Sequence, residues 1–305
     1  MTGTNWSEGK RFFSFIIEHL PSISTYPGVE GLFNPNEIAG AMSWLMPLCL
    51  GLTMYYFQKN RRLLSLIAGA GAGLLLLALL FGQSFSALAG IVVGIAIILI
   101  PRNYRVAGTG LIVAGILVIQ AVIFINPTLV VETAVRFSGR ENINSLEHRQ
   151  VMWTAARQAV IDHPVTGLGM AMFRSPAVWE DYPTPGYDRS KAVHAHNELL
   201  HIATDLGIPG FITMLSWYLG TFYMLYYAWK RSDSVTRWAV TGIAAGLIAH
   251  MIYGLADSIP LWDRFAFIFW WMLGLAAAQY TLARFRSEQS GETAQPDFDK
   301  NSDND

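Results

Sequence analysis

The chain has 305 residues, of which 52% are hydrophobic and 14% are charged, and its 21 basic and 22 acidic side chains give a formal net charge of −1. The apolar residues occur in runs of roughly 20 separated by short basic patches, which is the pattern of a polytopic membrane protein. No basic stripe interleaved with aromatic residues is present, so the sequence gives no indication of a nucleic-acid partner. The lone Cys49 has no second cysteine to pair with and is expected to pack in an apolar run.

Seven apolar runs predict membrane-spanning helices. A backbone inside hydrocarbon must satisfy its own hydrogen bonds, which favours helices. We therefore assign the fold class as all-α: a polytopic membrane bundle of about seven transmembrane helices with one long extracytoplasmic loop that contains short helices. We interpret the GAGAG stretch at 69–73 as a face for close helix packing, not as a phosphate-binding loop. The predicted spans are 37–57, 63–82, 84–100, 106–126, 207–228, 238–256 and 262–283.

Basic residues in alternate connections predict the orientation of these spans. The positive-inside rule places such connections in the cytoplasm. The long segment 127–206 and the turn at 257–264 then face outward, and so does the N-terminus. The basic residues that decide this are Lys59, Arg61 and Arg62, then Arg102 and Arg105, then Lys230, Arg231 and Arg237, and finally Arg284 and Arg286.

This topology divides the chain into five parts. Residues 1–36 form an extracytoplasmic N-terminal segment, 37–126 hold four spans, 127–206 form the extracytoplasmic loop, 207–283 hold three spans, and 284–305 form a disordered cytoplasmic tail. The tail is polar and acidic with Pro and Gly interruptions. The N-terminal segment has no signal-peptide pattern although it is placed outside. We therefore expect an N-terminally truncated form of a longer protein with more spans.

The 127–206 segment is too long for an ordinary connection, and loops of this length are usually functional. Within it, Met152, Ala155, Ala156 and Ala159 share one face and Pro164 follows, which predicts a helix over 146–162. Three further features are expected downstream: a glycine turn at Gly167 and Gly169, an irregular lid at 179–192, and a short helix over 194–207 that leads to the fifth span.

Short motifs occur in a fixed order along this loop and the spans beside it. They are NPNEIAG at 34–40, Arg149 with Trp153 four residues later, Pro164, Gly167, Gly169 and Phe173, HAHNEL at 194–199, LGIPG at 206–210 and YGLAD at 253–257. Each motif is weak alone, but their order resembles the O-antigen ligase and polymerase superfamily, the "Wzy_C" type of membrane glycosyltransferase. The resemblance runs from about residue 33 to residue 280.

One motif departs from the pattern of that family. Its members commonly carry a Ser-Arg-Ser/Gly-Ala type of sequence on an outward turn before a span. The corresponding stretch here is SFSA at 84–87, where Phe85 occupies the place of the arginine. Another basic residue must then take over phosphate binding if activity is retained.

The resemblance implies glycan transfer from a polyprenyl (undecaprenyl) diphosphate donor to an acceptor hydroxyl. The reaction would take place on the outer face of the cytoplasmic membrane, in cell-surface polysaccharide or lipopolysaccharide biosynthesis, and would need no cofactor or metal. Such a reaction has to neutralise a leaving diphosphate and deprotonate the attacking hydroxyl. Arginine suits the first task because its planar fork matches phosphate oxygens, and histidine suits the second because a neutral imidazole accepts a proton.

By resemblance, His196 is the general base and Arg149 the principal diphosphate ligand. Asn197 and Glu198 would orient the imidazole or the acceptor sugar, and His194 is the reserve candidate for the base. The resemblance also makes the 127–206 loop the catalytic segment. Further candidates for substrate binding in this loop are the basic residues Arg136, Arg140 and Arg174, the turn residue Gly169, and the aromatic residues Trp153, Trp179 and Tyr182, which could stack on sugar rings.

Structural interpretations compete with these roles. His19, His163 and His250 are expected to be interfacial polar groups. Arg149 could form a solvated surface pair with an acid such as Glu180, which contributes about 0 to 1 kcal/mol. Asp257 ends a span, and the sequence leaves a functional role and a capping role equally open.

Two other classes of protein compete with the transferase. A membrane metallohydrolase could use His194, Glu198 and His201, which share one helical face if the segment is helical. A lipid-linked glycan transporter would instead place ionisable residues along the spans, yet here they collect in the loop. Within the transferase class, a ligase, a polymerase and a protein O-oligosaccharyltransferase differ in the acceptor, which is a lipid A-core sugar, another glycan repeat or a protein serine.

Overall fold

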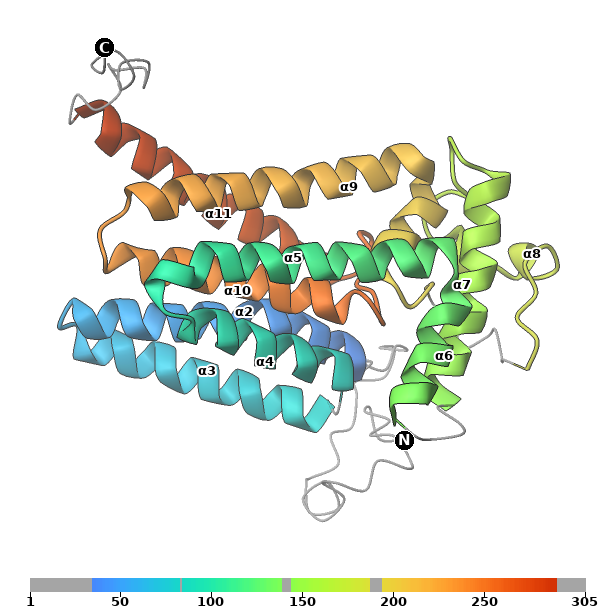
Figure 1. Cartoon of the computed structure of the whole chain (residues 1–305), viewed down its shortest axis with the longest axis horizontal. Coiled ribbons are helices and arrows are strands. Elements are labelled where there is room, and N and C mark those ends of the chain that lie inside the picture. Colours follow the sequence, from blue (N-terminus) through green and yellow to red (C-terminus); the bar gives the residue numbers. More distant parts are fainter. Residues whose placement is uncertain (1–34, 83, 139–143, 187–193, 290–305) are drawn as a thin grey trace, which may run out of the picture.

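A computed structural model describes residues 35–82, 84–138, 144–186 and 194–289. The described residues form helices joined by short connections, without a strand (Figure 1). The predicted N-terminal segment, with His19, lies almost entirely outside the described residues, as do Arg140 and most of the predicted tail. The long helices of the bundle are α2 (Pro35–Gln58), α3 (Arg62–Gly82), α4 (Phe85–Leu99), α5 (Arg102–Ile125), α9 (Glu198–Arg231), α10 (Thr236–Tyr253) and α11 (Ala266–Gln289).

These helices correspond to the seven predicted spans, so the predicted fold class is confirmed. Five of them, α2, α3, α5, α9 and α11, are long and apolar enough to cross a membrane. Helix α4 has 15 residues and is therefore about 22 Å long, shorter than a hydrocarbon core of about 30 Å. The chain is a multi-pass membrane protein with an all-helical bundle.

Helix α10 lies against several other helices of the bundle and makes close backbone contacts through small residues. A Cβ atom added at Gly246 would lie 2.2 Å from the carbonyl oxygen of Trp44 on α2, and one added at Gly90 on α4 would lie 2.1 Å from the carbonyl oxygen of Ala249. Small residues allow such approach between membrane helices. The glycines of α2, α4 and α10 thus determine how closely these three helices pack.

The GAGAG stretch has a smaller part in packing than we predicted. It lies within helix α3 and is not a phosphate loop. A Cβ atom at Gly69 or Gly71 would make only ordinary contacts with α2, at 3.6 Å or more, and one at Gly73 would meet nothing within 4 Å. The tight approaches occur elsewhere because the neighbouring face of α2 carries side chains, not bare backbone.

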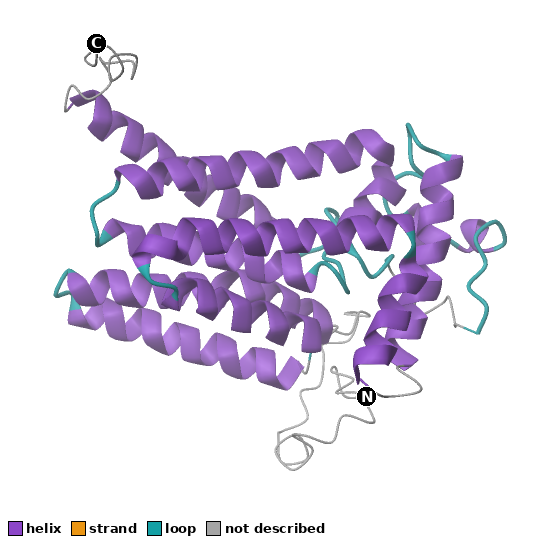
Figure 2. Ribbon diagram, in the orientation of Figure 1, coloured by secondary structure: helices purple, strands orange, loops and turns teal. Residues whose placement is uncertain are grey.

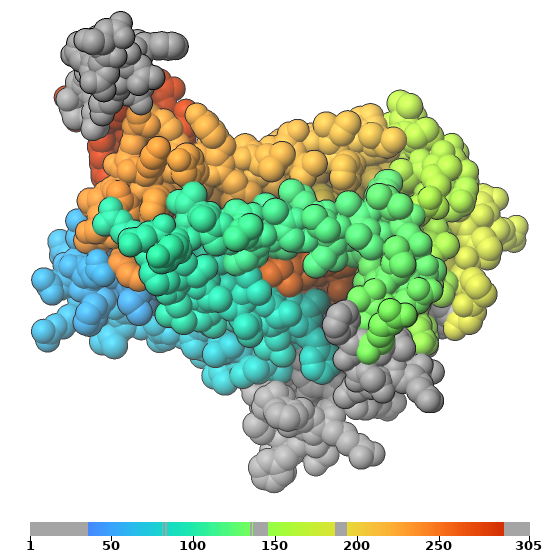
Figure 3. All heavy atoms as spheres, viewed as in Figure 1, coloured from blue at the N-terminus to red at the C-terminus, as the bar shows by residue number. Residues whose placement is uncertain are grey.

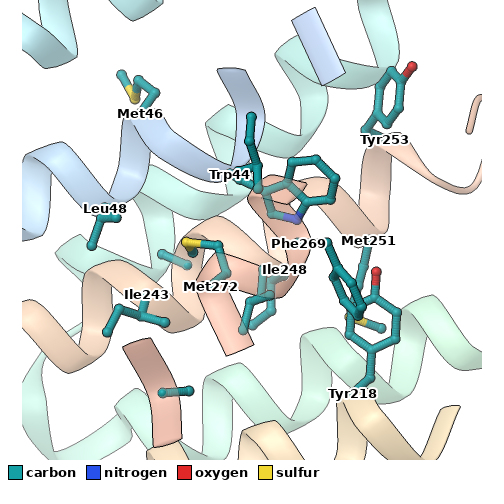
Figure 4. Close-up of a cluster of buried hydrophobic side chains, with 14 of the residues drawn as sticks. Trp44, Met46, Leu48, Tyr218, Ile243, Ile248, Met251, Tyr253, Phe269 and Met272 are labelled. Carbon is teal, nitrogen blue, oxygen red and sulfur yellow. The ribbon is translucent and has the colours of Figure 1, made fainter. Parts of the chain in front are cut away.

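Large apolar side chains fill the space around these backbone contacts. Trp44 from α2, Tyr218 from α9, Ile248 from α10 and Phe269 from α11 gather in the centre of the bundle (Figure 4). Phe269 makes ring contacts with both Trp44 and Tyr218. The apolar core therefore ties the first bundle helix to the last three.

The segment between α5 and α9 forms a second, smaller core across one end of the bundle. It contains α6 (Pro127–Ser138), α7 (Asn144–Asp162), the short 3₁₀ helix η2 (Met172–Arg174) and α8 (Pro176–Trp179). Helices α6 and α7 cross the end of the bundle (Figure 1). The predicted helix over 146–162 is confirmed as α7, whereas α6 is a helix that the sequence interpretation missed. The predicted apolar face is buried: Met152, Ala155, Ala156 and Ala159 pack with Phe173, Leu200 and the α5 residue Ile123.

Helix α9 contains a kink at Gly207, which has φ 70° and ψ −170°. A left-handed φ of this kind favours glycine. The turn after α7 supplies the hydrogen bonds that the kink interrupts, because the N–H groups of Leu168 and Gly169 donate to the carbonyls of Thr204 and Asp205, and Ile208 N–H donates to Pro164 O. The predicted short helix over 194–207 is therefore the first part of α9, which begins at Glu198 and is interrupted by the kink at Gly207.

The last helix extends beyond its predicted end. We predicted a span over 262–283 and a disordered tail from 284, but α11 begins at Ala266 and continues to Gln289. The exposed Arg284 and Glu288, four residues apart, form an ion pair at 2.9 Å along this extension. Residues spaced by one helical turn support each other in this way, which polar composition alone does not reveal.

We expect Gly246→Ala to lower the free energy of unfolding by about 1 to 3 kcal/mol, because the added methyl group overlaps the Trp44 carbonyl. The matched control is Gly274→Ala on α11, where a Cβ atom meets nothing within 4 Å. Thermal or denaturant unfolding of the purified protein in detergent measures both changes. Equal stability of the two variants would contradict the packing role of Gly246.

Candidate active site

Polar side chains from three distant segments meet where the second core covers the end of the bundle. They come from α7, from the 194–197 segment before α9 and from the 254–258 segment after α10. The connections of this end gather in one region (Figure 2). In the space-filling view, a hollow beside α5 and α6 leaves orange atoms of the α10 region visible (Figure 3).

The carboxylate of Asp257 lies between two imidazoles. Its Oδ1 atom is 3.4 Å from Nε2 of His194 and 3.3 Å from Nδ1 of His196, and it accepts the backbone N–H of Ser258 at 3.0 Å. We call His194, His196 and Asp257 the Asp257 cluster. Asp257 and His194 are each 1% exposed, whereas the side chain of His196 is 21% exposed. His196 is therefore the member that a substrate can reach.

The hydrogen bonds distinguish the two histidines chemically. The backbone N–H of His196 donates to Nδ1 of His194 at 3.2 Å, so the proton of neutral His194 is on Nε2, which faces Asp257. In His196 it is Nδ1 that faces Asp257, and a proton on Nδ1 leaves the lone pair on Nε2. Within the described residues no hydrogen bond is found at Nε2 of His196. This nitrogen can accept a proton, while both nitrogens of His194 are engaged.

The backbone at His196 is held in an uncommon conformation. Its φ is 51°, in the left-handed region that side chains other than glycine rarely adopt. The carbonyl of His196 accepts a hydrogen bond from Trp153 Nε1 at 2.9 Å. Such conformations persist where neighbouring structure fixes them, and they are frequent at functional sites. Helix α7 thus fixes the position of the more exposed imidazole.

Arg149, one helical turn before Trp153, brings a positive charge to the same place. Its Nε donates to the carbonyl of Ala256, the residue before Asp257. The guanidinium is close enough to lower the pKa values of both Asp257 and His194. The structure therefore places Arg149 beside Asp257 and His194.

Asn197 stabilises the start of α9. Its side-chain oxygen accepts the N–H of Leu200 at 2.9 Å and so caps the helix. The same amide exchanges two hydrogen bonds of 2.9 Å with Gln120 of α5 and donates to the carbonyl of Leu255. Asn197 is fully buried, and its side-chain amide is occupied by these contacts with the protein. We had expected the same amide to orient the imidazole or the sugar.

Glu198 forms a buried hydrogen bond with His250 of α10. Oε2 of Glu198 is 2.8 Å from Nε2 of His250, and the His250 ring stacks on Trp44 with 3.5 Å between ring centroids. The prediction that His250 is an interfacial polar group is wrong, because it lies in the bundle core. This pair links the site to α2 and α10. His163, which we also predicted to be interfacial, is exposed.

Other predicted binding residues have different environments. Trp153 is 1% exposed, so its ring has no free face for a sugar, which is a correction of its expected stacking role. Gly169 donates its N–H to the kink of α9. Phe85, the first residue of α4, is 83% exposed. Among the remaining residues, Arg136 and Arg174 are exposed, Tyr182 is buried, Trp179 is partly buried, and the guanidinium of Arg174 lies 4.5 Å from the ring centroid of Trp262.

The structure does not assemble the zinc trio that we considered from the sequence. Helix α9 begins at Glu198, so His194 precedes it and does not share its face. Glu198 is paired with His250, and His201 lies 3.5 Å from Asp205. The described residues that could together offer metal ligands are instead the members of the Asp257 cluster, whose ligand atoms lie within 4.8 Å of one another.

Burial and neighbouring charges determine the ionisation of the cluster. Burial, assisted by the neighbouring imidazole of His196, lowers the pKa of His194 from 6.5 to about 3, although Asp257 acts in the opposite direction. Burial alone would raise the pKa of Asp257, but the hydrogen bond with His196 and nearby positive charges, including Arg149, lower it to about 2. At neutral pH the cluster therefore contains a carboxylate and an uncharged His194.

The roles of two residues of this region were not established from the sequence alone. Gln120 was overlooked, although a lone polar side chain in an apolar span is a known signal of an interior contact. Asp257 was noted, but its role was left open between function and capping. The structure places its carboxylate in the centre of the cluster, and its Oδ1 also accepts the next backbone N–H.

The fold and this polar site define a multi-pass membrane protein with a site covered by helices at one end of its bundle. The sequence model of the family described as O-antigen ligase matches residues 70–215 of the chain. This stretch runs from α3 to α9 and includes Arg149, His194 and His196. The resemblance seen in the motifs is therefore confirmed by a family match over this stretch. A comparison with curated proteins gives no match.

We expect the protein to lose stability as the pH is lowered from about 6.5 toward 3. The pKa of His194 falls from 6.5 in the unfolded chain to about 3 in the folded protein, so between these values the unfolded state binds more protons. The loss is up to about 1.4 kcal/mol per pH unit for this one group. Unfolding in detergent between pH 7 and pH 5 measures it. His194→Gln should flatten the dependence, and an unchanged slope would contradict the assignment.

Proposed function

We propose that this protein is a membrane glycosyltransferase that moves a glycan from a polyprenyl diphosphate donor to an acceptor hydroxyl. The observation that carries the proposal is the position of His196: Asp257 holds its Nδ1, its Nε2 remains a base, and Arg149 lies beside the same carboxylate. The O-antigen ligase family match supports a membrane enzyme that processes glycans. The identity of the donor and of the transfer step is our proposal.

In this mechanism His196 acts as the general base. The acceptor hydroxyl gives its proton to Nε2 while its oxygen attacks the anomeric carbon of the donor sugar. Asp257 then faces an imidazolium, and its negative charge stabilises the positive charge that forms there. His194 remains uncharged and keeps Asp257 in place through its Nε2 proton. The bond between the anomeric carbon and the diphosphate oxygen breaks in the same step.

Arg149 stabilises the leaving group. The electron pair of the broken bond remains on the diphosphate, whose negative charge increases as it leaves. A guanidinium is permanently charged and matches phosphate oxygens, so it lowers the energy of this transition state. The bond from Arg149 Nε to the Ala256 carbonyl orients the group in advance. The exposed Arg174, whose guanidinium lies 4.5 Å from the centroid of the Trp262 ring, is a second candidate for a phosphate or sugar ligand.

We further propose that the site faces the outer side of the cytoplasmic membrane. The basic connections Lys59 to Arg62 and Arg231 to Arg237 lie at the end of the bundle opposite to the site, which the positive-inside rule places in the cytoplasm. A lipid A-core sugar, a further glycan repeat and a protein hydroxyl all offer the same nucleophile. We favour a ligase because the matching family is described as O-antigen ligase. A polymerase and a protein O-oligosaccharyltransferase are the alternatives.

We expect His196→Ala to lower the rate of glycan transfer by about 10²–10⁴-fold, because this is the usual contribution of a general base. Asp257→Asn should cause a loss of similar size, since an amide does not stabilise the imidazolium. Transfer from a synthetic polyprenyl diphosphate glycan by purified protein measures both changes. His163→Ala, at an exposed position beyond α7, is the control. Wild-type rates in His196→Ala would exclude the proposed base.

Arg149 is tested separately because its side chain also contacts the protein. Arg149→Gln should lower the transfer rate at least about 100-fold, a loss typical for a charged ligand of a transition state. Arg149→Lys keeps the charge and should recover part of the rate. The two variants are compared at equal folded yield. Equal activity of Arg149→Gln and wild type would reject a role in diphosphate binding.

Metal-assisted hydrolysis is the second candidate function, because the Asp257 cluster offers two imidazoles and a carboxylate. The proton positions inferred above account for the same contacts without an ion. We therefore expect glycan transfer to be unchanged after treatment with a strong chelator, measured on protein whose metal content is determined before and after. Loss of activity that added Zn²⁺ restores would instead support the metal-dependent function.

A further inference from the structure

A further hollow of the bundle is an apolar groove at the end opposite to the Asp257 cluster. It lies among the first half of α5, the last third of α9 and the first half of α10, and has a volume of about 240 Å³. Arg105 lies at one end of the groove and Val113 toward the middle of the bundle. Arg105 is 15 positions before Gln120, hence about 22 Å along the α5 axis from the site. The groove is therefore separate from the candidate active site.

The lining of the groove is almost entirely hydrocarbon. Val113, Leu219, Phe222, Leu225 and Val240 contribute to it, and none of the lining residues that the structure describes is acidic. In a membrane-spanning bundle such a surface is in contact with lipid chains. The volume is slightly below the range of about 300–1,000 Å³ that is usual for sites enclosing whole small ligands. A single hydrocarbon chain is the kind of occupant that fits.

Three cations surround one end of this groove. The guanidinium of Arg105 lines it and donates to the carbonyls of Ile98 and Ile100. A further cation lies near each of two aromatic rings that line the groove. Lys230 Nζ is 5.6 Å from the ring centroid of Tyr226, and the Arg237 guanidinium is 5.0 Å from the ring centroid of Trp229. The positive charges are thus held in fixed positions at the mouth of an apolar slot.

The acidic residue nearest to these cations along the sequence is hydrogen-bonded to backbone N–H groups. Asp233 lies in the connection between α9 and α10, and its carboxylate accepts the N–H groups of Val235 and Thr236 at the start of α10. Even with this one carboxylate counted, the three cations leave a net positive charge near the mouth of the groove. A ligand with a negative head and an apolar chain matches both parts.

The length of the groove favours a phospholipid. From Arg105 to Val113 it extends over eight residues, or about 12 Å along the helix axis. One leaflet of a bilayer has about 15 Å of hydrocarbon, half of the total of about 30 Å. A fatty acyl chain of one leaflet therefore fills the groove from its charged end, with its headgroup at the level of the cations.

We propose that this groove is a binding site for an anionic diacyl phospholipid, with one acyl chain between α5 and α9 and the phosphate headgroup beside Arg105, Lys230 and Arg237. The ligand is recognised by its negative charge together with its chain. The site is independent of the proposed glycosyl transfer, because it lies at the other end of the bundle and involves none of the residues of the Asp257 cluster.

Gly110 allows a direct test of the apolar part. It lines the groove, and a Cβ atom added there meets nothing within 4 Å, as is also true of Gly115 on the same helix, which does not line the groove. Purified protein in detergent is titrated with phosphatidylglycerol or with phosphatidylcholine of the same chains, and bound lipid is counted by native mass spectrometry. We expect Gly110→Leu to weaken phosphatidylglycerol binding at least about tenfold, and Gly115→Leu to leave it unchanged.

Lys230 tests the charged part, because its exposed side chain contacts only the Tyr226 ring among the described contacts. Wild-type protein should bind phosphatidylglycerol about tenfold more tightly than phosphatidylcholine, and Lys230→Gln should reduce this preference about fivefold. Lys230→Arg, which keeps the charge, should restore it. Because none of these measurements depends on catalysis, they remain informative if the proposed transferase activity is not found.

Three outcomes would overturn the proposal. Equal affinity of wild-type protein for the two phospholipids would mean that the groove holds ordinary membrane lipid without selection. Equal loss of binding in Gly110→Leu and Gly115→Leu would place the lipid elsewhere on α5. Displacement of phosphatidylglycerol by polyprenyl phosphate at equal concentration would identify the occupant as a polyprenyl chain.

Discussion

The buried carboxylate of Asp257 is the group on which the architecture of the polar end depends. Removing an ionised carboxylate from water costs several kcal/mol unless charges and hydrogen bonds compensate for it. Here the compensation comes from two imidazoles, a backbone N–H and the nearby charge of Arg149. These groups belong to three separate segments. The contacts that stabilise this one negative charge therefore connect α7, the 194–197 segment and the end of α10.

Two further buried polar pairs connect this end to the membrane-spanning helices. The Gln120–Asn197 amide pair joins α5 to the start of α9, and the Glu198–His250 hydrogen bond joins α9 to α10 and, through the stacked Trp44, to α2. A shift of any of these helices by one residue would leave a buried polar group without its partner. Such groups are costly in a low-dielectric interior. The pairs thus determine which helices meet and in which register.

The two ends of the bundle have different chemistry, and the difference follows from what each must contact. The site end combines a carboxylate, imidazoles and a guanidinium beneath a small apolar core of its own. The opposite end presents an apolar groove whose mouth is surrounded by cations held against aromatic rings. Close glycine contacts on α2, α4 and α10 separate these ends with a tightly packed centre. In one chain, packing between small residues thus supplies a rigid centre between two ends of different polarity.

The sequence by itself determined the helical membrane bundle, because runs of apolar residues long enough to cross hydrocarbon leave a chain few alternatives to the helix. It also determined the buried face of α7 through the spacing of Met152, Ala155, Ala156 and Ala159, and the order of its motifs indicated the family. Only the tertiary structure decided that Asp257 joins His196, a residue 61 positions away, that Glu198 pairs with His250 instead of holding zinc, and that Trp153 is buried. Periodicity specifies which face of a helix is apolar. The partners of a polar side chain depend on how distant helices pack against one another, and that information is not contained in any local stretch of the chain.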